Sequence, residues 1–448
     1  MIDKKKKYAI LGLARSGIAA AKKLSSMGLC PFISDLNDKS FDEETAAFLA
    51  DYPHELGVHS EKLFEYDCWI VSPGIPLDVP IIKEGKKRGI ELISEIEFGY
   101  RIKAEDSKII AVTGSNGKST TVSLVHHILK SMGKSSILAG NIGAAFCSFP
   151  IEKPGTEYII LEISSFQLDL ISSFKPDVAT LLNITPDHLN RYESFDDYAF
   201  SKTSIFKYQT EQDFGIINKD CAETLKHLRE KPGKMLSFSM DDPAADAFIK
   251  DKRLQIGDYS FELNELLIRG PHNHQNLMAA MLIIKALGLD LQQAYEAALN
   301  FPSLPHRLEY VTTINGISFY NDSKATNTDS VRCALRSFER PIRLILGGSD
   351  KGEDFDLLTD ELKEHTVKIY VTGDTIPQMR QAWLGKLPMT IDEDFEHCVR
   401  LAFAEADHGE SVVLSPACAS FDHFKNFEHR GEYFKQIVWE LKREKEQI

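Results

Sequence analysis

The chain has 448 residues, of which 43% are hydrophobic, and a formal net charge of −14 at pH 7. Its length suits about three domains with a sizeable apolar core. The acidic balance argues against nucleic acid as the main partner, because binding nucleic acid needs a broad basic surface. No stretch approaches the roughly 20 apolar residues of a membrane span, so we expect no membrane partner either.

The seven cysteines are scattered and form no C-x-x-C pair. This spacing favours reduced thiols in the cytoplasm over a disulfide framework or a zinc site. The opening "MIDKKKKYAILGLARSG" imitates a signal peptide, but Arg15 interrupts its apolar run and no small-residue cleavage site follows. We therefore interpret it as the first strand of the fold.

The first segment predicts a βαβ arrangement. An apolar strand over 8–11 enters the turn "GLARSG", an amphipathic helix follows over 18–27, and the strand "CPFISD" ends at Asp35. The strand of "CWIVSPGIP" stops in a Pro-Gly turn, and two further helices are expected over 80–88 and 95–101.

The polar "KAEDSK" precedes a new strand over 109–112 and places a domain boundary near residue 104. Strands then alternate with helices through "SSILAG", "YIILEIS", "VATLLNI", a helix over 195–208 and "FGIIN". Two helices, "HNHQNLMAAMLIIKALG" and "LQQAYEAALNF", lead to the linker "PSLPHR" near residue 304, and the strands "ISFYND", "RLILGG", "KIYVTG" and "SVVLSP" repeat the scheme. Such alternation is typical of an α/β fold with mainly parallel sheets. We expect domains over 1–104, 105–304 and 305–448.

The stretch "AVTGSNGKSTTVSLVHHILK" predicts a phosphate-binding loop between a strand and a helix. It matches T-G-x-x-G-K-S, while Val112 stands where the longer Walker pattern has glycine. Lys118 can reach the outer phosphates and Ser119 can ligate Mg²⁺. The competing interpretation is an ordinary Gly-containing turn. The residues expected at the nucleotide are Gly114, Ser115, Asn116, Gly117, Lys118, Ser119 and Thr120.

The turn "GLARSG" is a weaker signal. Gly12, Gly17 and Asp35 fit the dinucleotide fingerprint, but Ala14 stands where a second glycine would let a pyrophosphate approach closely. A bound nucleotide and a purely structural βαβ turn both remain open here.

Two polar residues follow the phosphate loop at positions suited to a metal. Glu162 ends the apolar run of "LEISSFQL", and His188 follows another strand in "NITPDHLNRY", so both lie where open α/β sheets bind ligands. Solvated loop residues are the alternative interpretation. Lys202, in "YAFSKTSIF", taken alone suits the surface of a helix.

Three further clusters carry a family resemblance: "PHNHQNLMAA", "LPHRLEYV" with "YNDSKATNTDS", and "LGGSDKGEDF" with "LSPACASFDHFKNFEHRG". With them the chain resembles the Mur ligases over essentially its full length. "TGSNGKST" alone would fit any Mur ligase or folylpolyglutamate synthase, whereas "NDSKATN" and "SPACASFDHFKNFEHRG" resemble the D-glutamate-adding branch. The D-N-P-R motif of diaminopimelate-adding relatives is absent.

The resemblance implies a Rossmann-like N-terminal domain for a UDP-linked substrate, a central P-loop ATPase domain, and a Rossmann-like C-terminal domain for the amino acid. The implied reaction is ATP-driven amide formation between UDP-N-acetylmuramoyl-L-alanine and D-glutamate, through an acyl phosphate. Because water must be kept from that intermediate, domain closure is expected. A cytoplasmic monomer is implied.

The resemblance also assigns catalytic and metal-binding residues. Lys118 would stabilise the transferring phosphoryl group, and Ser119 with Glu162 would hold the Mg²⁺ of the nucleotide. His188 and Lys202 would serve a second metal ion, with Lys202 carrying a carbamate.

Further contacts are implied for the three substrates. Those for ATP are Asn273, Arg307, Asp322 and Lys324. Those for D-glutamate are Thr326, Lys351, Ser420 and Phe427, among which a cation and hydroxyls suit a dicarboxylate. Those for the UDP group are Arg15, Ser16, Asp35, Ser72, Pro73, Gly74 and Asn141.

The chain departs from the family pattern at Ala14, which stands in place of a glycine, and at Asn190 and Tyr192. The first change leaves the geometry of the uridine site open, and the other two affect the surroundings of His188.

Two other functions remain possible at this point: a Mur ligase for a different amino acid, and a nucleotide-gated binding protein without amino-acid-dependent turnover.

Overall fold

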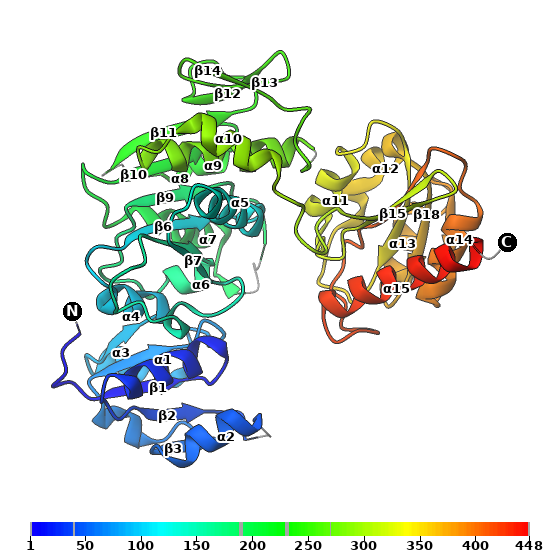
Figure 1. Ribbon diagram of the computed structural model, residues 1–448. Helices are drawn as coiled ribbons and strands as arrows, with labels where there is room; N and C mark the ends of the chain where they lie inside the picture. Colours follow the sequence, from blue (N-terminus) through cyan, green and yellow to red (C-terminus); the bar gives the residue numbers. More distant parts are fainter. Residues whose placement is uncertain (1, 39–40, 188–190, 229–232, 269, 447–448) are drawn as a thin grey trace. The chain divides into compact units, whose positions relative to one another are not determined.

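Three β-sheets follow one another along the chain (Figure 1). The computed structural model describes residues 2–38, 41–187, 191–228, 233–268 and 270–446. By its internal contacts the chain divides into two units: Met1–Glu265 with Gln275–Leu299, and Leu266–His274 with Asn300–Ile448. The first two sheets belong to the first unit and the third sheet to the second unit.

The first sheet is parallel throughout, with strand order β3-β2-β1-β4-β5. Its central strands "YAIL" and "CWIV" are fully buried, as expected where helices cover both faces. The strands are β1 (Tyr8–Leu11), β2 (Phe32–Asp35), β3 (His54–Leu56), β4 (Cys68–Val71) and β5 (Glu91–Ile93). The helices are α1 (Arg15–Ser26), α2 (Glu43–Ala50), the 3₁₀ turn η1 (Glu61–Glu65), α3 (Pro80–Lys87) and α4 (Glu95–Ile102).

The second sheet has the order β14-β13-β12-β11-β10-β9-β6-β8-β7. It is parallel from β7 to β12 and antiparallel over β12, β13 and β14. Its strands are β6 (Lys108–Thr113), β7 (Ser136–Gly140), β8 (Tyr158–Glu162), β9 (Val178–Leu181), β10 (Phe214–Asn218), β11 (Lys234–Ser239), β12 (Ala247–Lys250), β13 (Arg253–Ile256) and β14 (Tyr259–Glu262).

The helices between and after these strands include α9, whose residues 277–284 are completely buried. A helix that is apolar on all sides belongs in a protein interior. The helical elements are α5 (Lys118–Ser131), η2 (Phe146–Ser148), α6 (Ser165–Leu168), α7 (Phe195–Thr203), η4 (Ser204–Phe206), α8 (Ala222–His227), α9 (Pro271–Ala286) and α10 (Leu291–Leu299).

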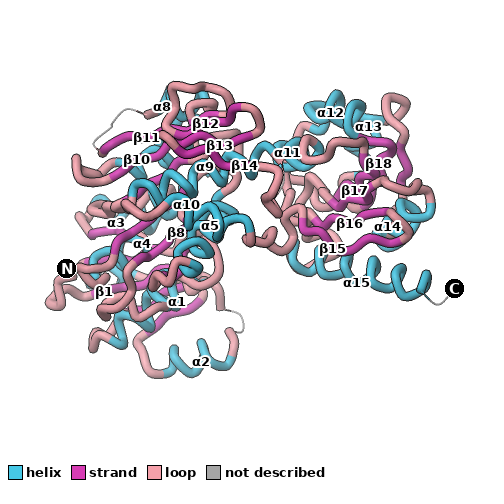
Figure 2. Tube along the Cα trace, turned by 45° about the horizontal axis from the view of Figure 1, so that its top comes forward, coloured by secondary structure: helices cyan, strands magenta, loops and turns pink. Residues whose placement is uncertain are grey.

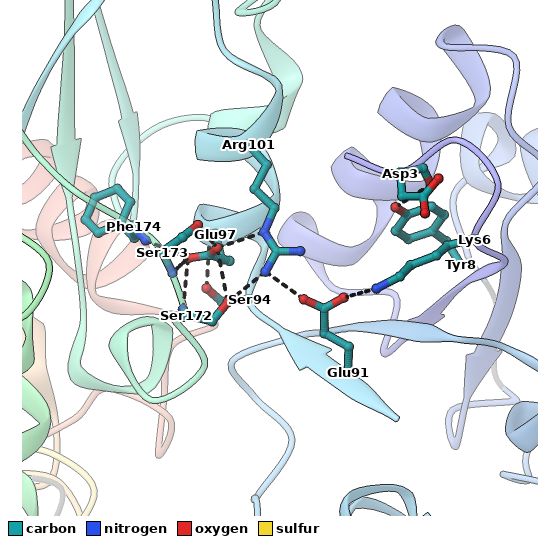
Figure 3. Close-up of polar contacts among 10 residues, drawn as sticks. All are labelled: Asp3, Lys6, Tyr8, Glu91, Ser94, Glu97, Arg101, Ser172, Ser173 and Phe174. Carbon is teal, nitrogen blue, oxygen red and sulfur yellow. Dashed lines mark hydrogen bonds and ion pairs between the residues drawn. The ribbon is translucent and has the colours of Figure 1, made fainter. Parts of the chain in front are cut away.

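A buried carboxylate connects α4 with the loop that follows α6 (Figure 3). The side chain of Glu97 is completely buried, and its Oε2 accepts the backbone N–H groups of Ser172, Ser173 and Phe174 at 3.0, 3.0 and 2.8 Å. Its Oε1 accepts from Arg101 Nε at 2.8 Å. Because α4 directly follows the last strand of the first sheet, these bonds fix that part of the chain against the second sheet's domain.

The third sheet has the order β15-β16-β20-β17-β18-β19 and is parallel except for the pair β15–β16. Apolar residues of α11, α12 and α13 pack on one face, and those of α14 and α15 on the other (Figure 2). The elements are β15 (Glu309–Ile314), β16 (Ile317–Asn321), α11 (Thr328–Leu335), β17 (Ile342–Gly347), η5 (Phe355–Leu358), α12 (Thr359–His365), β18 (Thr366–Thr372), α13 (Ile376–Trp383), β19 (Met389–Ile391), α14 (Phe395–Ala404), β20 (Ser411–Leu414) and α15 (Phe427–Glu446).

The predicted α/β class with mainly parallel sheets is confirmed, and several element bounds differ from the predicted ones. The first helix begins at Arg15 and not at residue 18. The helix expected over 195–208 ends at Thr203 and continues as a 3₁₀ turn. The antiparallel strands β12 to β14 were not expected from the sequence. Within the described residues, no helix combines the length and apolar character needed to span a membrane.

Candidate functional site

The predicted phosphate loop lies between β6 and α5, as its sequence indicates. Gly117 directly precedes α5 with a φ of 85°, and Gly114 has a φ of 153°. A Cβ atom at Gly117 would lie 2.4 Å from Asn276 Oδ1. Both the backbone conformation and the available space therefore require glycine here, and the loop delivers a helix N-terminus of the kind that binds phosphate.

Lys118 is held over this loop by the loop's own carbonyl groups. Its Nζ donates to the carbonyl oxygens of Gly114 and Ser115, both at 2.7 Å. Lys118 is the first residue of α5. The ammonium group thus lies at the loop's rim, where the outer phosphates of a bound nucleotide are expected.

Glu162, the last residue of β8, is a buried carboxylate with one oxygen available for a cation. The residue is 3% exposed, and its Oε1 accepts from Asn141 Nδ2 at 2.9 Å. Its Oε2 is buried and, among the described residues, has no hydrogen-bond partner. Since buried carboxylate oxygens are otherwise almost always paired, this atom favours a bound cation.

The donor set fits Mg²⁺ in particular. The described part of the chain contains no group of three or more His, Cys, Asp or Glu side chains able to hold a metal ion by themselves. Mg²⁺ typically takes one or two protein oxygens and completes its shell with water and phosphate oxygens. The Glu162 carboxylate and the Ser119 hydroxyl are oxygen donors of that type, so they would hold the ion together with a nucleotide.

Lys202 is a buried residue and not the solvated helix lysine that its local sequence suggested. It is 3% exposed, its Nζ donates to the carbonyl oxygen of Gly114 at 2.9 Å, and it lies 4.7 Å from the centroid of the Tyr198 ring. Burial, and then the nearby Lys118, lower the pKa of Lys202 well below its usual value. The structure therefore brings Lys202 to the phosphate loop, whereas His188 and Asn190 lie outside the described residues.

Tyr192 and Tyr198 support this region. Tyr198 and Ser115 share a hydrogen bond of 2.9 Å between their hydroxyl groups. Tyr192, one of the departures from the family pattern, donates its hydroxyl to Asp169 Oδ2 at 3.0 Å. Tyr192 therefore hydrogen-bonds to a carboxylate that also accepts from Ser201 of α7.

The turn after β1 has the geometry of a nucleotide-binding βαβ unit. Gly12 has a φ of 86°, and a Cβ at Gly17 would lie 1.8 Å from the carbonyl oxygen of Gly12. Asp35, at the end of β2, accepts from the backbone N–H of Leu13, and Ser72 Oγ donates to Gly12 O at 2.7 Å. The carboxyl ends of β1, β2 and β4 therefore meet where the strand order reverses, which is where such sheets bind ligands.

The other residues predicted for the UDP group follow strands of the first sheet, except Asn141, which follows β7 of the second sheet. Arg15 is exposed, and its Nη1 donates to the carbonyl oxygen of Gly143 at 3.1 Å, in the loop after β7 that also contains Asn141. Ser16 is half-buried in α1. Pro73 and Gly74 directly follow Ser72.

The second unit contains the further residues predicted for ATP and those predicted for the amino acid, and two of them, Lys324 and Phe427, are in contact. Asp322 is buried after β16 and accepts from Ser415 Oγ at 2.8 Å and from the backbone N–H of Leu308 at 3.1 Å. Burial raises the pKa of Asp322 to about 7. Lys324 Nζ lies 3.6 Å from the centroid of the Phe427 ring.

The remaining predicted residues differ in exposure. Ser420 is buried, Thr326 and Arg307 are half-buried, and Lys351 is exposed on the loop after β17. Asn273 lies in the first turn of α9, within the part of that helix that belongs to the second unit.

Arg430 organises these loops, although no motif in the sequence indicates that role. It is 1% exposed in α15, and its guanidinium donates to Ser323 O at 2.9 Å, Cys418 O at 3.0 Å, Ala419 O at 3.1 Å and Gly347 O at 3.4 Å. One side chain thus fixes the carboxyl end of β17 and the segments after β16 and β20. Its only signal in the sequence was its place within "FEHRG".

Comparison with known families matches three consecutive regions of the chain. Residues 6–94 match "Mur ligase MurD-like, N-terminal domain", residues 112–284 match "Mur ligase middle domain", and residues 306–418 match "Mur ligase, glutamate ligase domain". The three matches correspond to the three sheets described above.

Curated relatives match over nearly the whole length. Proteins named UDP-N-acetylmuramoylalanine–D-glutamate ligase are 38% identical in Koribacter versatilis, over 97% of this chain and 97% of that protein. The corresponding protein of Cytophaga hutchinsonii is 40% identical over 97% and 99%, and that of Bacillus subtilis is 35% identical over 98% and 98%.

Solved structures share the fold at lower identity. UDP-N-acetylmuramate-alanine ligase MurC from Thermotoga maritima has a TM-score of 0.61 at 19% identity, covering 98% of this chain and 100% of that one. MurF ligase from the same organism, in complex with ADP, has a TM-score of 0.63 at 15% identity, covering 98% and 100%. By its three family domains and its full-length relatives, the chain belongs to the Mur ligase family and has that family's MurD-like N-terminal domain.

Proposed function

We propose that the chain is an ATP-dependent ligase that joins D-glutamate to UDP-N-acetylmuramoyl-L-alanine, in the cytoplasmic synthesis of peptidoglycan precursors. The observation that carries this proposal is the 38–40% sequence identity, over 97% of the chain, to relatives named for that reaction. The phosphate-binding loop at the start of α5 supports it. It acts as a monomer. Residues 1–104 bind the UDP-linked substrate, 105–304 bind ATP, and 305–448 bind the amino acid.

The reaction has two chemical steps. A carboxylate oxygen of the L-alanyl group attacks the γ-phosphorus of ATP, so that ADP leaves and an acyl phosphate forms. The amine of D-glutamate then attacks the acyl carbon, loses a proton and expels inorganic phosphate. Activation is necessary because a carboxylate oxygen is otherwise a poor leaving group.

Lys118 stabilises the first step. Its ammonium group, bonded to Gly114 O and Ser115 O at 2.7 Å each, exchanges these neutral acceptors for phosphate oxygens when a triphosphate occupies the loop. A fixed cation beside the transferring group is stabilising mainly where charge develops in the transition state. Ser119 and Glu162 would hold the nucleotide Mg²⁺, which would neutralise part of the phosphate charge.

Lys202 carries a carbamate in this proposal. Its burial and the nearby Lys118 disfavour the ammonium form, and the neutral amine is the form to which carbon dioxide can add. Carbon dioxide adds to the neutral amine, an N–C bond forms and one proton is released. The product would offer oxygen ligands suited to a second Mg²⁺, which His188 would also bind.

Amino-acid-dependent phosphate release tests the function. The purified chain is incubated with ATP, Mg²⁺ and UDP-N-acetylmuramoyl-L-alanine, and phosphate is measured with D-glutamate, L-alanine, L-lysine or diaminopimelate. We expect release with D-glutamate only, and the coupled product in the mass spectrum. Release with another amino acid would indicate a different Mur ligase, and ATP binding without amino-acid-dependent release would indicate a nucleotide-gated binding protein.

A further inference from the structure

The segment after β9 contains an arginine to which neither the motifs nor the proposed mechanism assigns a role. Arg191 Nη1 donates to the carbonyl oxygen of Gly74 at 2.8 Å, and its Nη2 donates to those of Pro73 and Ile75 at 2.7 Å each. Three consecutive carbonyl groups of one loop therefore converge on one guanidinium. The contact joins segments that follow strands of different sheets. The loop with the three carbonyl groups follows β4 of the first sheet, and Arg191 follows β9 of the second sheet.

An aromatic ring holds the same guanidinium. The Arg191 Cζ lies 4.7 Å from the centroid of the Phe166 ring, a distance typical of a cation–π contact. Phe166 belongs to the short helix α6, whose start is fixed by a capping box between Ser164 and Gln167. The contacts from α6 and from the loop thus restrict the orientation of the planar group.

The loop over residues 73–75, to which Arg191 donates hydrogen bonds, is part of the expected UDP site. It follows Ser72, whose Oγ donates to Gly12 O at 2.7 Å, and it turns back through a hydrogen bond of 3.0 Å from Ile75 N to Ser72 O. Both contacts lie at the carboxyl edge of the first sheet, where its strand order reverses. Loop 73–75 therefore lies beside the nucleotide-binding turn.

We propose that Arg191 is a positioning residue for the UDP-linked substrate, acting through loop 73–75. Its guanidinium fixes the three carbonyl groups and neutralises their partial negative charge at a site that must accept an anion. This matters in a chain whose net charge is −14, because the attraction for a diphosphate must come from local cations. The inference rests on the proposed function, which supplies the identity of the substrate.

The expected effect is selective. The phosphate loop has its own contacts, from Tyr198 to Ser115 at 2.9 Å and from Lys202 to Gly114 at 2.9 Å. Removing the Arg191 side chain leaves both contacts in place. The UDP-linked substrate should therefore bind more weakly while ATP is used as before.

The test compares Arg191→Ala and Arg191→Lys with the matched control Arg88→Ala. Arg88 also places its guanidinium over a phenylalanine, 3.8 Å from the Phe64 centroid, but its ion pairs are with Glu84 of α3 and with Glu61, which are not predicted substrate residues. The Kd for UDP-N-acetylmuramoyl-L-alanine is measured by calorimetry without ATP, and KM is measured for all three substrates. Hydrogen exchange of the peptide over 72–77 reports on the loop without any ligand.

We expect Arg191→Ala to raise the Kd and KM for the UDP-linked substrate about tenfold, as for the loss of a charge-assisted contact. KM for ATP and D-glutamate should stay unchanged, and exchange over 72–77 should become faster. Arg191→Lys should recover part of the affinity, since it keeps the charge but not the planar fork. Arg88→Ala should match the wild type in all of these measurements.

Two results would overturn the proposal: unchanged exchange and unchanged Kd in Arg191→Ala, or equal increases in KM for all three substrates, which would indicate general damage. A wild-type chain that does not bind the UDP-linked substrate would refute the proposed function instead. In that case the exchange of peptide 72–77 still decides whether Arg191 orders the loop.

Discussion

Lys118 and Lys202 donate to the same acceptor, the backbone carbonyl oxygen of Gly114, at 2.7 and 2.9 Å. Two ammonium groups this close to one oxygen repel each other, and Lys118 is the second cause, after burial, that lowers the pKa of Lys202. A carbamate on Lys202 would turn this repulsion into an attraction. The shared contact therefore leads directly to a prediction about the chemical state of Lys202.

We predict a bicarbonate-dependent carbamate on Lys202. In ¹³C-bicarbonate the wild-type protein should give a carbamate signal in the NMR spectrum, and acidification should remove it because protonated carbamates lose CO₂. Lys202→Ala should lack the signal and the ligase activity. The control is Lys207→Ala, since Lys207 is exposed and also lies over a tyrosine ring, 5.1 Å from the Tyr208 centroid. Full activity in Lys202→Ala would contradict the prediction.

Lys118→Ala should abolish turnover without unfolding the chain. Removing one preorganised donor to developing charge typically costs about 10²–10³ in kcat, and a full cation should cost at least as much. Thermal unfolding should stay close to that of the wild type, because the positive φ of Gly114 and Gly117 and the bond between Tyr198 and Ser115 constrain the loop independently of the Lys118 side chain. Lys130→Ala, at the exposed end of the same helix, is the control. Near-normal ligation by Lys118→Ala would mean that the loop is not the ATP site.

Much of the fold could be predicted because its signals are local. The buried runs of β1 and β4, and the glycines at Gly12 and Gly117, record local requirements of strand burial and positive φ. The turn between β12 and β13 illustrates the opposite case. Asp251 and Lys252 adopt φ of 53° and 60°, and although aspartate suits the first position of such a turn, Lys252 stands where glycine usually follows. The hairpin over 247–262 was missed for that reason, even though Gly257 marks its second turn.

The residues of the candidate site also include some whose positions have a local sequence signal and others whose positions have none. The positions of Gly-Lys-Ser at the start of α5 and of Glu162 at the end of β8 could be predicted from the sequence, because both follow from local strand and helix patterns. The burial of Lys202 could not, since its acceptor Gly114 is far away in the sequence. Arg430 likewise gains its role only when the fold brings Gly347 and Cys418 to one guanidinium. Non-local packing of this kind leaves no spacing pattern.

Glu97→Gln should destabilise the first unit. Removing one partner from a buried, hydrogen-bonded ion pair typically costs about 3–5 kcal/mol, and Glu97 is completely buried against Arg101 and three backbone N–H groups. The control is Glu84→Gln. Glu84 and Arg88 have the same i,i+4 spacing and the same 2.8 Å distance, but they are exposed, so chemical denaturation should detect little change.

The stability contributed by Glu97 should depend on pH with a defined sign. Burial alone would raise the pKa of Glu97, but the hydrogen bonds from Ser173, Ser172 and Arg101 outweigh burial and lower the pKa below 4.5. A carboxyl group whose pKa is lower in the folded state contributes its full stability above the unfolded pKa and loses it as pH falls through the folded pKa. The difference in unfolding free energy between wild type and Glu97→Gln should therefore shrink below pH 4.5. A difference that stays constant down to pH 3 would contradict this.

Lys351→Ala should weaken the use of D-glutamate and leave ATP unaffected. Lys351 is an exposed cation on the loop after β17, and that loop is held by Arg430 through Gly347 O and by the bond of 2.9 Å from Ser349 N to Ala419 O. A charge-assisted hydrogen bond to a carboxylate is worth about 1.5–3 kcal/mol, so KM for D-glutamate should rise about tenfold or more. Lys386→Ala, which removes another exposed lysine of the same unit, should change neither KM. Initial rates with each substrate varied in turn give both values. If KM for ATP rises and that for D-glutamate does not, Lys351 serves the nucleotide, and the amino-acid site must be sought on other loops of this sheet.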